Sequence, residues 1–501
     1  MMLLDSFLHL AEPTVFAIVV LGVLLGLAVG VLPGITGGML MALTLPFTYY
    51  MTSENAVILL VSQFVGGISG GLVTATLMRI PGEPNAVMTC LDGYPLAKKG
   101  FPGRALGLGN AASIVGGVLS WCALVLLAPP LAKAAIALGP WEEFAIVCVA
   151  LVLIAALSSG SLVKGLMSAL FGMMVALPGI DATSGTLRLT FGFEHLSAGI
   201  ELLPAVIGIF AISQILADTL NIEGQSTDHV RANLKGIMIS LRDYARYGLN
   251  MLRSALIGIT MGILPGVGST IASIIAYTTA KNVSRHPEQF GHGSEEAIVA
   301  TESANNATSG GTLIPLLTLG IPGGLADSVL LGALILHNLQ PGPLLYAHHP
   351  EIVNAIMATH LVAHFVTFAL MTQGVALFAR LMLISSAWIF PLVLVFCVVG
   401  AYSLSNQMFD VGVMLVFALI GIGFEFAKVP LAPFVVGFVL APLGEGKLRA
   451  SLMSSDGDLS AILGRPIALV LLAVAAGMLV LPTLRARFLA RRLAEIPQAQ
   501  V

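Results

Sequence analysis

The sequence predicts an all-α polytopic membrane protein built from two inverted-topology repeats, with interrupted or re-entrant helices and roughly 11 to 13 spans. Three observations predict this class. The composition is strongly apolar, long windows lack any charged residue, and a pair of Gly/Pro motifs occurs twice with reversed charge around it.

The composition identifies the surroundings of the chain. Of its 501 residues, 57% are hydrophobic and only 10% are charged, and the mean hydropathy is +0.96. A soluble domain carries about 25% charged residues, so this balance excludes a soluble enzyme of this size and a disordered chain. The net charge of −3 offers no basic surface for nucleic acid. We therefore expect a lipid bilayer as the partner and no nucleic acid.

Windows without Asp, Glu, Lys or Arg give the candidate spans, since a spanning helix needs about 20 mostly apolar residues. These windows are 13–53, 55–78, 105–132, 144–163, 165–180, 254–280, 303–326, 328–350, 352–379, 381–409, 411–424, 429–444 and 466–484. Residues 196–220 add a span interrupted only by Glu201 and Asp218. The N-terminus lacks the basic region of a signal peptide, so we expect the first helix to be retained.

Two motifs occur twice in the same order. GVLPG at Gly30 to Gly34 returns as GILPG at Gly262 to Gly266. SGGLVTATLMRIPG, from Ser69 to Gly82, returns as SGGTLIPLLTLGIPG, from Ser309 to Gly323. Small residues also recur every four positions before each Leu-Pro-Gly, which places them on one helix face where another backbone can approach. The pattern predicts an internal structural repeat.

The charges that flank the two copies are reversed. Lys and Arg near spans favour the cytoplasm. Basic residues precede and follow the second Leu-Pro-Gly but not the first, whereas they follow only the first Ile-Pro-Gly. The expected organisation is a first inverted membrane repeat over 1–220, a polar cytoplasmic linker over 221–253, a second inverted repeat plus an extra helix over 254–484, and a basic cytoplasmic tail over 485–501.

Each Leu-Pro-Gly segment is expected to return to the side of the membrane that it left. Residues 254–280 are too few for two full crossings at about 1.5 Å per residue. A re-entrant hairpin tipped near Pro265 and Gly266 is one arrangement, and two crossings by short tilted helices is the other. The Leu-Pro-Gly and Ile-Pro-Gly positions are therefore predicted to be helix breaks inside the membrane.

Matching helix breaks in inverted repeats indicate a secondary transporter's midplane site. A broken helix exposes N–H groups and positive partial charge at one end, which suit an anion, and carbonyls at the other, which suit a cation. The candidate substrate- or ion-binding residues are Pro33, Gly34, Thr36, Gly37, Ser69, Gly70, Gly71, Pro81, Gly82, Pro265, Gly266, Gly268, Ser269, Asn305, Asn306, Thr308, Ser309, Gly310, Pro322 and Gly323. A Na⁺ ion is expected near Asn306, Thr308 and Ser309; structural helix packing is the alternative role for each residue.

Other polar residues have structural interpretations that we prefer. Arg79 ends an uncharged run and either faces an anionic substrate or, preferably, extends to the cytoplasmic interface. His360 and His364 share a helix face and either relay protons or, preferably, pack or bond between helices. No P-loop, HExxH or GxSxG motif occurs in the sequence, which weakens ATP-driven transport and intramembrane hydrolysis. No enzyme activity and no cofactor are expected.

The motifs resemble the large integral membrane subunit of the tripartite tricarboxylate transporters over nearly the whole chain. The resemblance rests on GVLPGITGG (Gly30 to Gly38), IPGEPNAVMTCLDGYPLAKKG (Ile80 to Gly100), GILPGVGS (Gly262 to Ser269) and ESANNATSGGTLIPLLTLGIPG (Glu302 to Gly323). QPGPLLY (Gln340 to Tyr346) and PLAPFVVGFVLAPLGEGKLRASL (Pro430 to Leu452) also fit.

The resemblance implies a multi-pass carrier of the bacterial inner membrane. It implies a small four-span membrane subunit and a periplasmic solute-binding protein as partners, and import of a carboxylate such as citrate driven by a Na⁺ or H⁺ gradient. A single-subunit organic-anion carrier, or a passive channel that needs no binding protein, is the alternative function. We expect one rigid block that carries the broken helices to move against a static scaffold.

Overall fold

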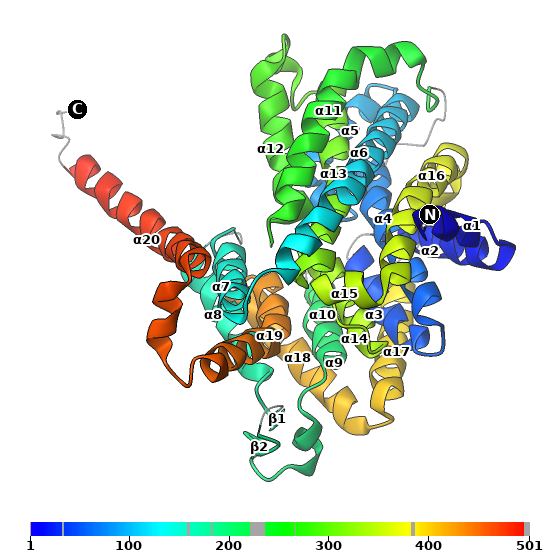
Figure 1. Cartoon of the computed structure of the whole chain (residues 1–501). Helices are drawn as coiled ribbons and strands as arrows, with labels where there is room; N and C mark the ends of the chain where they lie inside the picture. The colour runs from blue at the N-terminus through cyan, green and yellow to red at the C-terminus, as the bar shows by residue number, and fades with distance from the viewer. Residues whose placement is uncertain are drawn as a thin grey trace. The chain divides into compact units, whose positions relative to one another are not determined.

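The computed structural model describes residues 2–32, 35–157, 161–181, 184–220, 236–265, 267–381 and 386–494. These residues are almost entirely helical and form two compact units, one of residues 1–136 and 200–427 and the other of residues 137–199 and 428–501. The helices of the first unit, labelled in Figure 1, are α1 (Met2–Leu10), α2 (Pro13–Val31), α3 (Gly37–Thr48), α4 (Ser53–Met78), α5 (Val87–Lys98), α6 (Pro102–Ile136), α9 (Leu202–Val206), α10 (Ser213–Leu220), α11 (Leu241–Ile263), α12 (Gly268–Val283), α13 (Glu295–Leu319), α14 (Leu325–Leu336), α15 (Pro343–His348), α16 (Pro350–Leu381), α17 (Ser386–Ser405) and α18 (Met408–Phe426).

The second unit consists of helices that pack on one another and a small hairpin. Its elements are α7 (Pro140–Leu157), α8 (Leu162–Val175), β1 (Gly179–Ile180), β2 (Leu187–Arg188), α19 (Ala432–Ser454) and α20 (Pro466–Ala494). The two strands are antiparallel, with Gly179 opposite Arg188. Arg188 of the hairpin forms a bidentate pair with Glu445 of α19, at 2.5 and 2.7 Å. This ion pair ties the hairpin to α19.

Length and composition support the predicted membrane class. Among the described residues, five helices are long and apolar enough to cross a membrane, namely α2, α4, α6, α16 and α18. The chain is thus an all-α polytopic membrane protein. Helix α11 begins at Leu241, inside the predicted linker and before the charge-free window, because a capping box of Ser240 and Asp243 starts the helix there. Its 23 residues span about 34 Å at 1.5 Å per residue.

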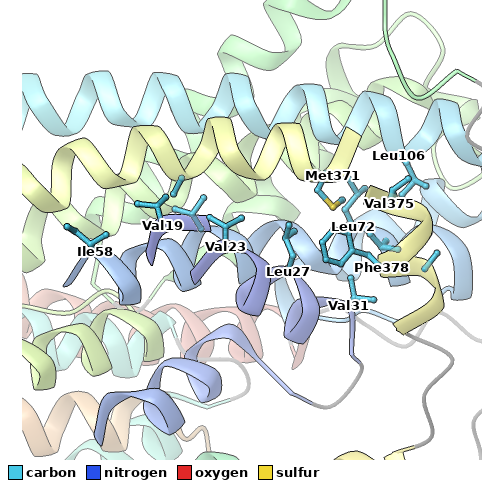
Figure 2. Packing of buried hydrophobic residues seen from close by; sticks show 14 of the residues in the cluster. Val19, Val23, Leu27, Val31, Ile58, Leu72, Leu106, Met371, Val375 and Phe378 are labelled. Atoms are coloured by element: carbon cyan, nitrogen blue, oxygen red, sulfur yellow. The ribbon is translucent and has the colours of Figure 1, made fainter. Parts of the chain in front are cut away.

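A row of apolar residues on α2 forms the core of the first unit. Val19, Val23, Leu27 and Val31 recur every four residues and are fully buried. Figure 2 shows them against side chains of α4 and α16, including Leu72 and Phe378. Spacing of four keeps the row on one helix face. The buried face of α2 therefore fixes α4 beside it.

The glycine rows lie where helix backbones touch. A Cβ added at Gly30 of α2 would lie 2.4 Å from the carbonyl oxygen of Gly67 on α4, and one at Gly26 would lie 2.4 Å from that of Gln63. On α11, a Cβ at Gly258 would lie 2.2 Å from the carbonyl oxygen of Ala304 on α13. The close backbone approach expected from the small-residue spacing is confirmed at these positions.

Each half of the chain carries one motif pair, a Leu-Pro-Gly motif followed by an Ile-Pro-Gly motif, and the two pairs have matching backbone geometry. Helices α2 and α11 both end before an extended leucine, Leu32 at φ −87°, ψ 117° and Leu264 at φ −82°, ψ 116°. Helices α4 and α13 both end at a left-handed residue, Arg79 at φ 61° and Gly320 at φ 70°. The chain breaks its helices in the same way at corresponding points of the two motif pairs.

Contacts between these segments are crossed. The carboxylate of Asp92 on α5, which follows α4, accepts hydrogen bonds from the backbone N–H groups of Gly291, Gly293 and Ser294, just before α13. Conversely, Leu325 at the start of α14, which follows α13, packs on Gly38 of α3, which precedes α4. The segment that follows each Ile-Pro-Gly helix therefore contacts a segment that precedes the helix of the other copy.

Candidate functional site

The centre of the first unit is the polar stretch of α13. The side chain of Ser294 caps this helix by accepting from the N–H of Ala297 at 3.3 Å, so the helix begins well before the polar residues. Glu302, Asn305 and Asn306 are each at most 1% exposed. Buried polar groups need hydrogen-bond partners, so each of these side chains should bond to a neighbouring helix or to its own.

Asn306 connects three helices. Its Oδ1 accepts from the hydroxyl of Ser69 on α4 at 2.8 Å, and its Nδ2 donates to the hydroxyl oxygen of Ser113 on α6 at 2.8 Å. The neighbouring Asn305 donates from Nδ2 to the carbonyl oxygen of Ile68 at 3.4 Å. The structure thus brings the polar stretch of one motif pair against the Ser-Gly-Gly of the other.

Glu302 lies one helical turn before Asn306. Its carboxylate accepts from the hydroxyl of Thr89 on α5 at 2.5 Å and from that of Ser113 at 3.5 Å. The hydroxyls of Thr89 and Thr301 are 3.0 Å apart. Four helices, α4, α5, α6 and α13, therefore contribute to one buried hydrogen-bonded cluster of hydroxyls, amides and a carboxylate.

Two buried histidines extend this cluster. The hydroxyl of Ser309 lies 2.9 Å from Nε2 of His360 and 3.4 Å from Nε2 of His364, both on α16. The same hydroxyl donates to the carbonyl oxygen of Asn306 at 2.6 Å. The two histidines therefore bond between helices, which is one of the roles that the sequence left open for them. Their partner, Ser309, is one of the predicted site residues.

The residues at the two helix breaks of the first motif pair, after α2 and after α4, both pack against α4. Thr36 caps α3 by accepting from the N–H of Met39 at 3.2 Å. The N–H of Gly37, the first residue of α3, donates to the carboxylate of Glu83, which follows Ile-Pro-Gly. Gly82 packs so closely on the carbonyl oxygen of Gly30 that a Cβ would lie 2.1 Å from it. A carboxylate thus binds at a helix N-terminus, as expected for an anion.

The second motif pair meets on α13 in a similar way. A Cβ at Gly262 would lie 2.7 Å from the carbonyl oxygen of Thr308, and one at Gly323 would lie 2.7 Å from the Thr312 side chain. The preceding Pro322 is buried, and so is Asp327 in the first turn of α14. Gly268 begins α12 at φ 66°. The break residues of this copy therefore lie along one side of α13 and at the start of α12.

The remaining predicted residues have packing contacts. The hydroxyl of Thr308 donates to the carbonyl oxygen of Ala304 in its own helix, at 2.8 Å. Gly70 packs against Gly30, and Gly310 packs against Ser120. Gly71 contacts Ala86 and Glu83, Pro81 is half-buried in the break after α4, and Pro265 and Ser269 are half-buried beside the break before α12. Pro33, Gly34 and Gly266 lie outside the described residues.

Sequence reasoning missed several residues that complete the cluster. Thr89 and Ser113 are single hydroxyls in otherwise ordinary helical sequence, so nothing local identifies them. Glu83 and Asp327 carried a usable signal, because each is an acidic residue within a few positions after an Ile-Pro-Gly. Both are buried, at 9% and 2% exposure, and each lies beside the start of a short helix.

A charged cluster lies at the polar start of α11 and α13. Arg104 donates to Asp243 at 2.6 Å and to Glu295 at 3.1 and 2.9 Å. The hydroxyl of Tyr247 donates to Glu295 at 2.6 Å. The hydrogen bond from Arg104 lowers the pKa of Asp243 far below the ordinary aspartate range. These pairs fix the starts of both helices to the start of α6.

The fold and this buried polar cluster between interrupted helices define a multi-pass membrane protein with an internal polar site. The model of the Tripartite tricarboxylate transporter TctA family matches residues 16–436, and the chain belongs to this family. The family is one of transporters and not of enzymes.

Two relatives from Agrobacterium vitis are similar to the chain. One, described as an uncharacterised 52.8 kDa protein in the TAR-I ttuC' 3' region, is 34% identical over 470 residues, which is 93% of each chain. The other, from the TAR-II ttuC' 3' region, is 35% identical over 233 residues, covering 46% of this chain and 96% of the relative. No solved structure matches the chain.

Proposed function

We propose that this protein is the large membrane subunit of a binding-protein-dependent secondary active transporter that imports carboxylates such as citrate across a bacterial inner membrane. A Na⁺ or H⁺ gradient drives the import. A small four-span membrane subunit and a periplasmic solute-binding protein complete the system. Membership of the tripartite tricarboxylate transporter family supports the class of function.

The observation that carries the proposal is the bond between Ser69 and Asn306. Ser69 begins the first Ser-Gly-Gly motif, Asn306 lies three residues before the second, and their side chains meet at 2.8 Å in the buried centre of the first unit. The matching helix ends at Leu32 and Leu264, together with the crossed contacts of α5 and α14, support an inverted repeat around this point. Paired helix breaks on either side of a polar centre suit a midplane transport site.

The chemistry near the breaks suits a carboxylate. The Glu83 side chain at the N-terminus of α3 supports this proposal, because it places at this helix end the same chemical group that a di- or tricarboxylate would present. Hydroxyl and amide groups line the centre, and these can bind an anion or coordinate a cation without a buried fixed positive charge. The substrate's remaining charge is then balanced by the coupling cation.

Reconstitution tests this proposal. The protein is placed in liposomes with its small subunit, and uptake of radiolabelled citrate is measured with and without the binding protein under an imposed Na⁺ or pH gradient. We expect uptake only with the binding protein and a gradient. Uptake that needs neither would establish the single-subunit carrier or channel instead.

Variants of the central residues test the site. Asn306→Ala and Ser309→Ala remove the bonds to Ser69 and to the histidines, so the cation dependence of uptake should weaken in both. Thr318→Ala is the matched control, since its hydroxyl only donates to the carbonyl oxygen of Ile314 within α13. An unchanged Na⁺ and pH response in both site variants would remove them from the proposed site.

A further inference from the structure

We propose that Glu302 binds the coupling ion of this carrier and that this ion is a proton. The inference rests on the proposed function as a gradient-driven importer, which leaves the ion open. It assigns a role to a residue outside the predicted binding set, from its burial, its partners and the buried histidine in the same polar cluster.

Glu302 is buried without a Lys or Arg partner among the described residues. Glu302 is 0% exposed. Within the described part of the chain, no Lys or Arg pairs with it: Arg104 pairs with Glu295, two helical turns earlier, and Arg253 interacts with Glu296. An ionised carboxylate buried without a partner costs several kcal/mol, of the order seen for unpaired buried charges. The Glu302 carboxyl group therefore requires a bound proton or a bound cation.

The hydrogen-bond partners of the Glu302 carboxyl group suit a proton. Its oxygens meet the hydroxyls of Thr89 and Ser113, which can donate to a carboxylate and equally accept from a carboxylic acid. The site can therefore hold both protonation states with the same side chains. A metal cation instead needs several oxygen lone pairs that converge on one point. Within the described residues, the only hydroxyl oxygens that hydrogen-bond to the carboxyl group of Glu302 are those two.

A buried imidazole belongs to the same polar cluster as Glu302. Ser113 links Glu302 to the side-chain amide of Asn306, at 3.5 and 2.8 Å. The carbonyl oxygen of Asn306 accepts from Ser309, whose hydroxyl lies 2.9 Å from His360. His360 is fully buried, and among the described residues its Nδ1 has no hydrogen-bond partner. Imidazole accepts and releases protons but is a poor ligand for Na⁺, so its presence in this cluster favours a proton over Na⁺.

Other titratable groups lie on the elements packed around α13. The Cys90 thiol of α5 interacts electrostatically with Glu302, and the carboxyl groups of Glu83 and Asp327 are buried beside the breaks after α4 and α13. Asp92 of α5 and Tyr277 of α12 bond to each other before the start of α13. Helix α4 contributes the hydroxyl of Ser69 through Asn306. The charged groups of α6 and α11 lie at the polar start of α13, as described above.

Glu302 binds and releases one proton in each transport cycle. One proton from the outer side binds the Glu302 carboxylate and forms the neutral carboxylic acid while substrate occupies the site. After the site opens inward, the O–H bond breaks, the proton leaves to the cytoplasm, and the carboxylate is restored. No oxidant, reductant or covalent intermediate takes part.

Glu302→Gln tests the coupling, with Glu296→Gln as the matched control on the same helix. The full system is reconstituted with its binding protein, the membrane potential is held at zero, and radiolabelled citrate is the probe. One coupled proton supports about tenfold accumulation per pH unit. We expect this accumulation with the native protein and Glu296→Gln, and its loss in Glu302→Gln. Citrate exchange in Glu302→Gln should proceed at a rate that no longer depends on pH. Accumulation in Glu302→Gln equal to that of the native protein would overturn the assignment.

A second measurement needs no substrate and keeps the two proposals separate. Infrared difference spectra of the full-length protein in lipid nanodiscs are recorded during a pH titration without Na⁺ and with it. We expect a C=O component of a buried carboxylic acid, beside any from the buried Glu83 and Asp327, that Glu302→Gln removes, that Glu302→Asp retains at a shifted position, and that Na⁺ leaves unchanged. Identical bands in the native protein and in Glu302→Gln, or a Glu302 component abolished by Na⁺, would refute the proton assignment. Absence of citrate uptake by the native protein would instead count against the proposed function.

Discussion

The contact between α11 and α13 makes the stability of this protein sensitive to a single methyl group. Replacing Gly258 by alanine would put a Cβ 2.2 Å from the carbonyl oxygen of Ala304 and 2.9 Å from the Cβ of Ala307. Ordinary contact begins near 3.4 Å, so the two helices would have to separate by roughly 1 Å. The matched control is Gly248 on the same helix, where an added Cβ meets no atom within 4 Å.

The expected magnitude follows from this geometry. A gap of about 1 Å forfeits roughly a quarter to a half of the dispersion energy along a contact, and overpacking typically costs about 1–3 kcal/mol. Because backbone opposes the new methyl group, we expect Gly258→Ala to cost roughly 3 kcal/mol, about two orders of magnitude in the ratio of folded to unfolded protein. Gly248→Ala should be neutral or stabilising by about 0.5–1 kcal/mol, since alanine favours the helix.

The assay is unfolding of the purified protein in mixed micelles, by heat and by denaturant, followed by circular dichroism and tryptophan fluorescence. Gly258→Ala should lower both midpoints, while Gly248→Ala should leave them in place or raise them. Equal midpoints for the two variants would mean that α11 and α13 do not meet as closely as described, and the argument from the glycine rows would fail.

Three further predictions concern other contacts. Gly30→Leu and Gly262→Leu should insert into the membrane but abolish citrate uptake, because each side chain would enter a backbone contact; normal uptake by either would contradict this. Asp92→Asn should weaken the hydrogen bonds to the turn before α13 and so destabilise that turn by about 1–3 kcal/mol. Amide hydrogen exchange in the turn should become faster, and unchanged exchange would contradict the role assigned to Asp92. Asp243 has a lowered pKa, so its contribution to stability is present above the ordinary aspartate pKa of about 3.9 and is lost as pH falls below it. Asp243→Asn should therefore melt earlier than the native protein at pH 7, with a difference that closes as the pH falls below about 4; a difference independent of pH would refute this.

The sequence alone was sufficient for the fold class and for part of the site. Composition and charge-free windows predicted the all-α membrane fold because lipid leaves few other solutions for the backbone. The spacing of Gly26 and Gly30 predicted close helix contact, which the structure contains. The duplicated motif led to Ser69 and the polar stretch before its second copy led to Asn306, and these two side chains meet. The inverted relation of the repeats and the transported ion remain predictions.

Other features depend on tertiary contact and could not be read locally. Thr89 and Ser113 reach Glu302 only because α5 and α6 pack against α13, which no local pattern encodes. Windows based on charge also place helix boundaries too late wherever a helix continues beyond its apolar segment. Helix α11 begins at Leu241 for this reason, although the Ser240-x-x-Asp243 capping box was available as a signal.

The crossed contacts of α5 and α14 make the two motif pairs dependent on each other. Asp92 holds the turn before α13, and Leu325 covers Gly38 at the start of α3, so each copy of the motif pair secures an end of the other. Loss of one of these contacts would therefore destabilise both copies. A second substitution in the opposite copy would then lower the free energy of unfolding by less than it does in the otherwise native protein. In a genetic screen, compensating changes for a defect in one half of the protein should map to the other half.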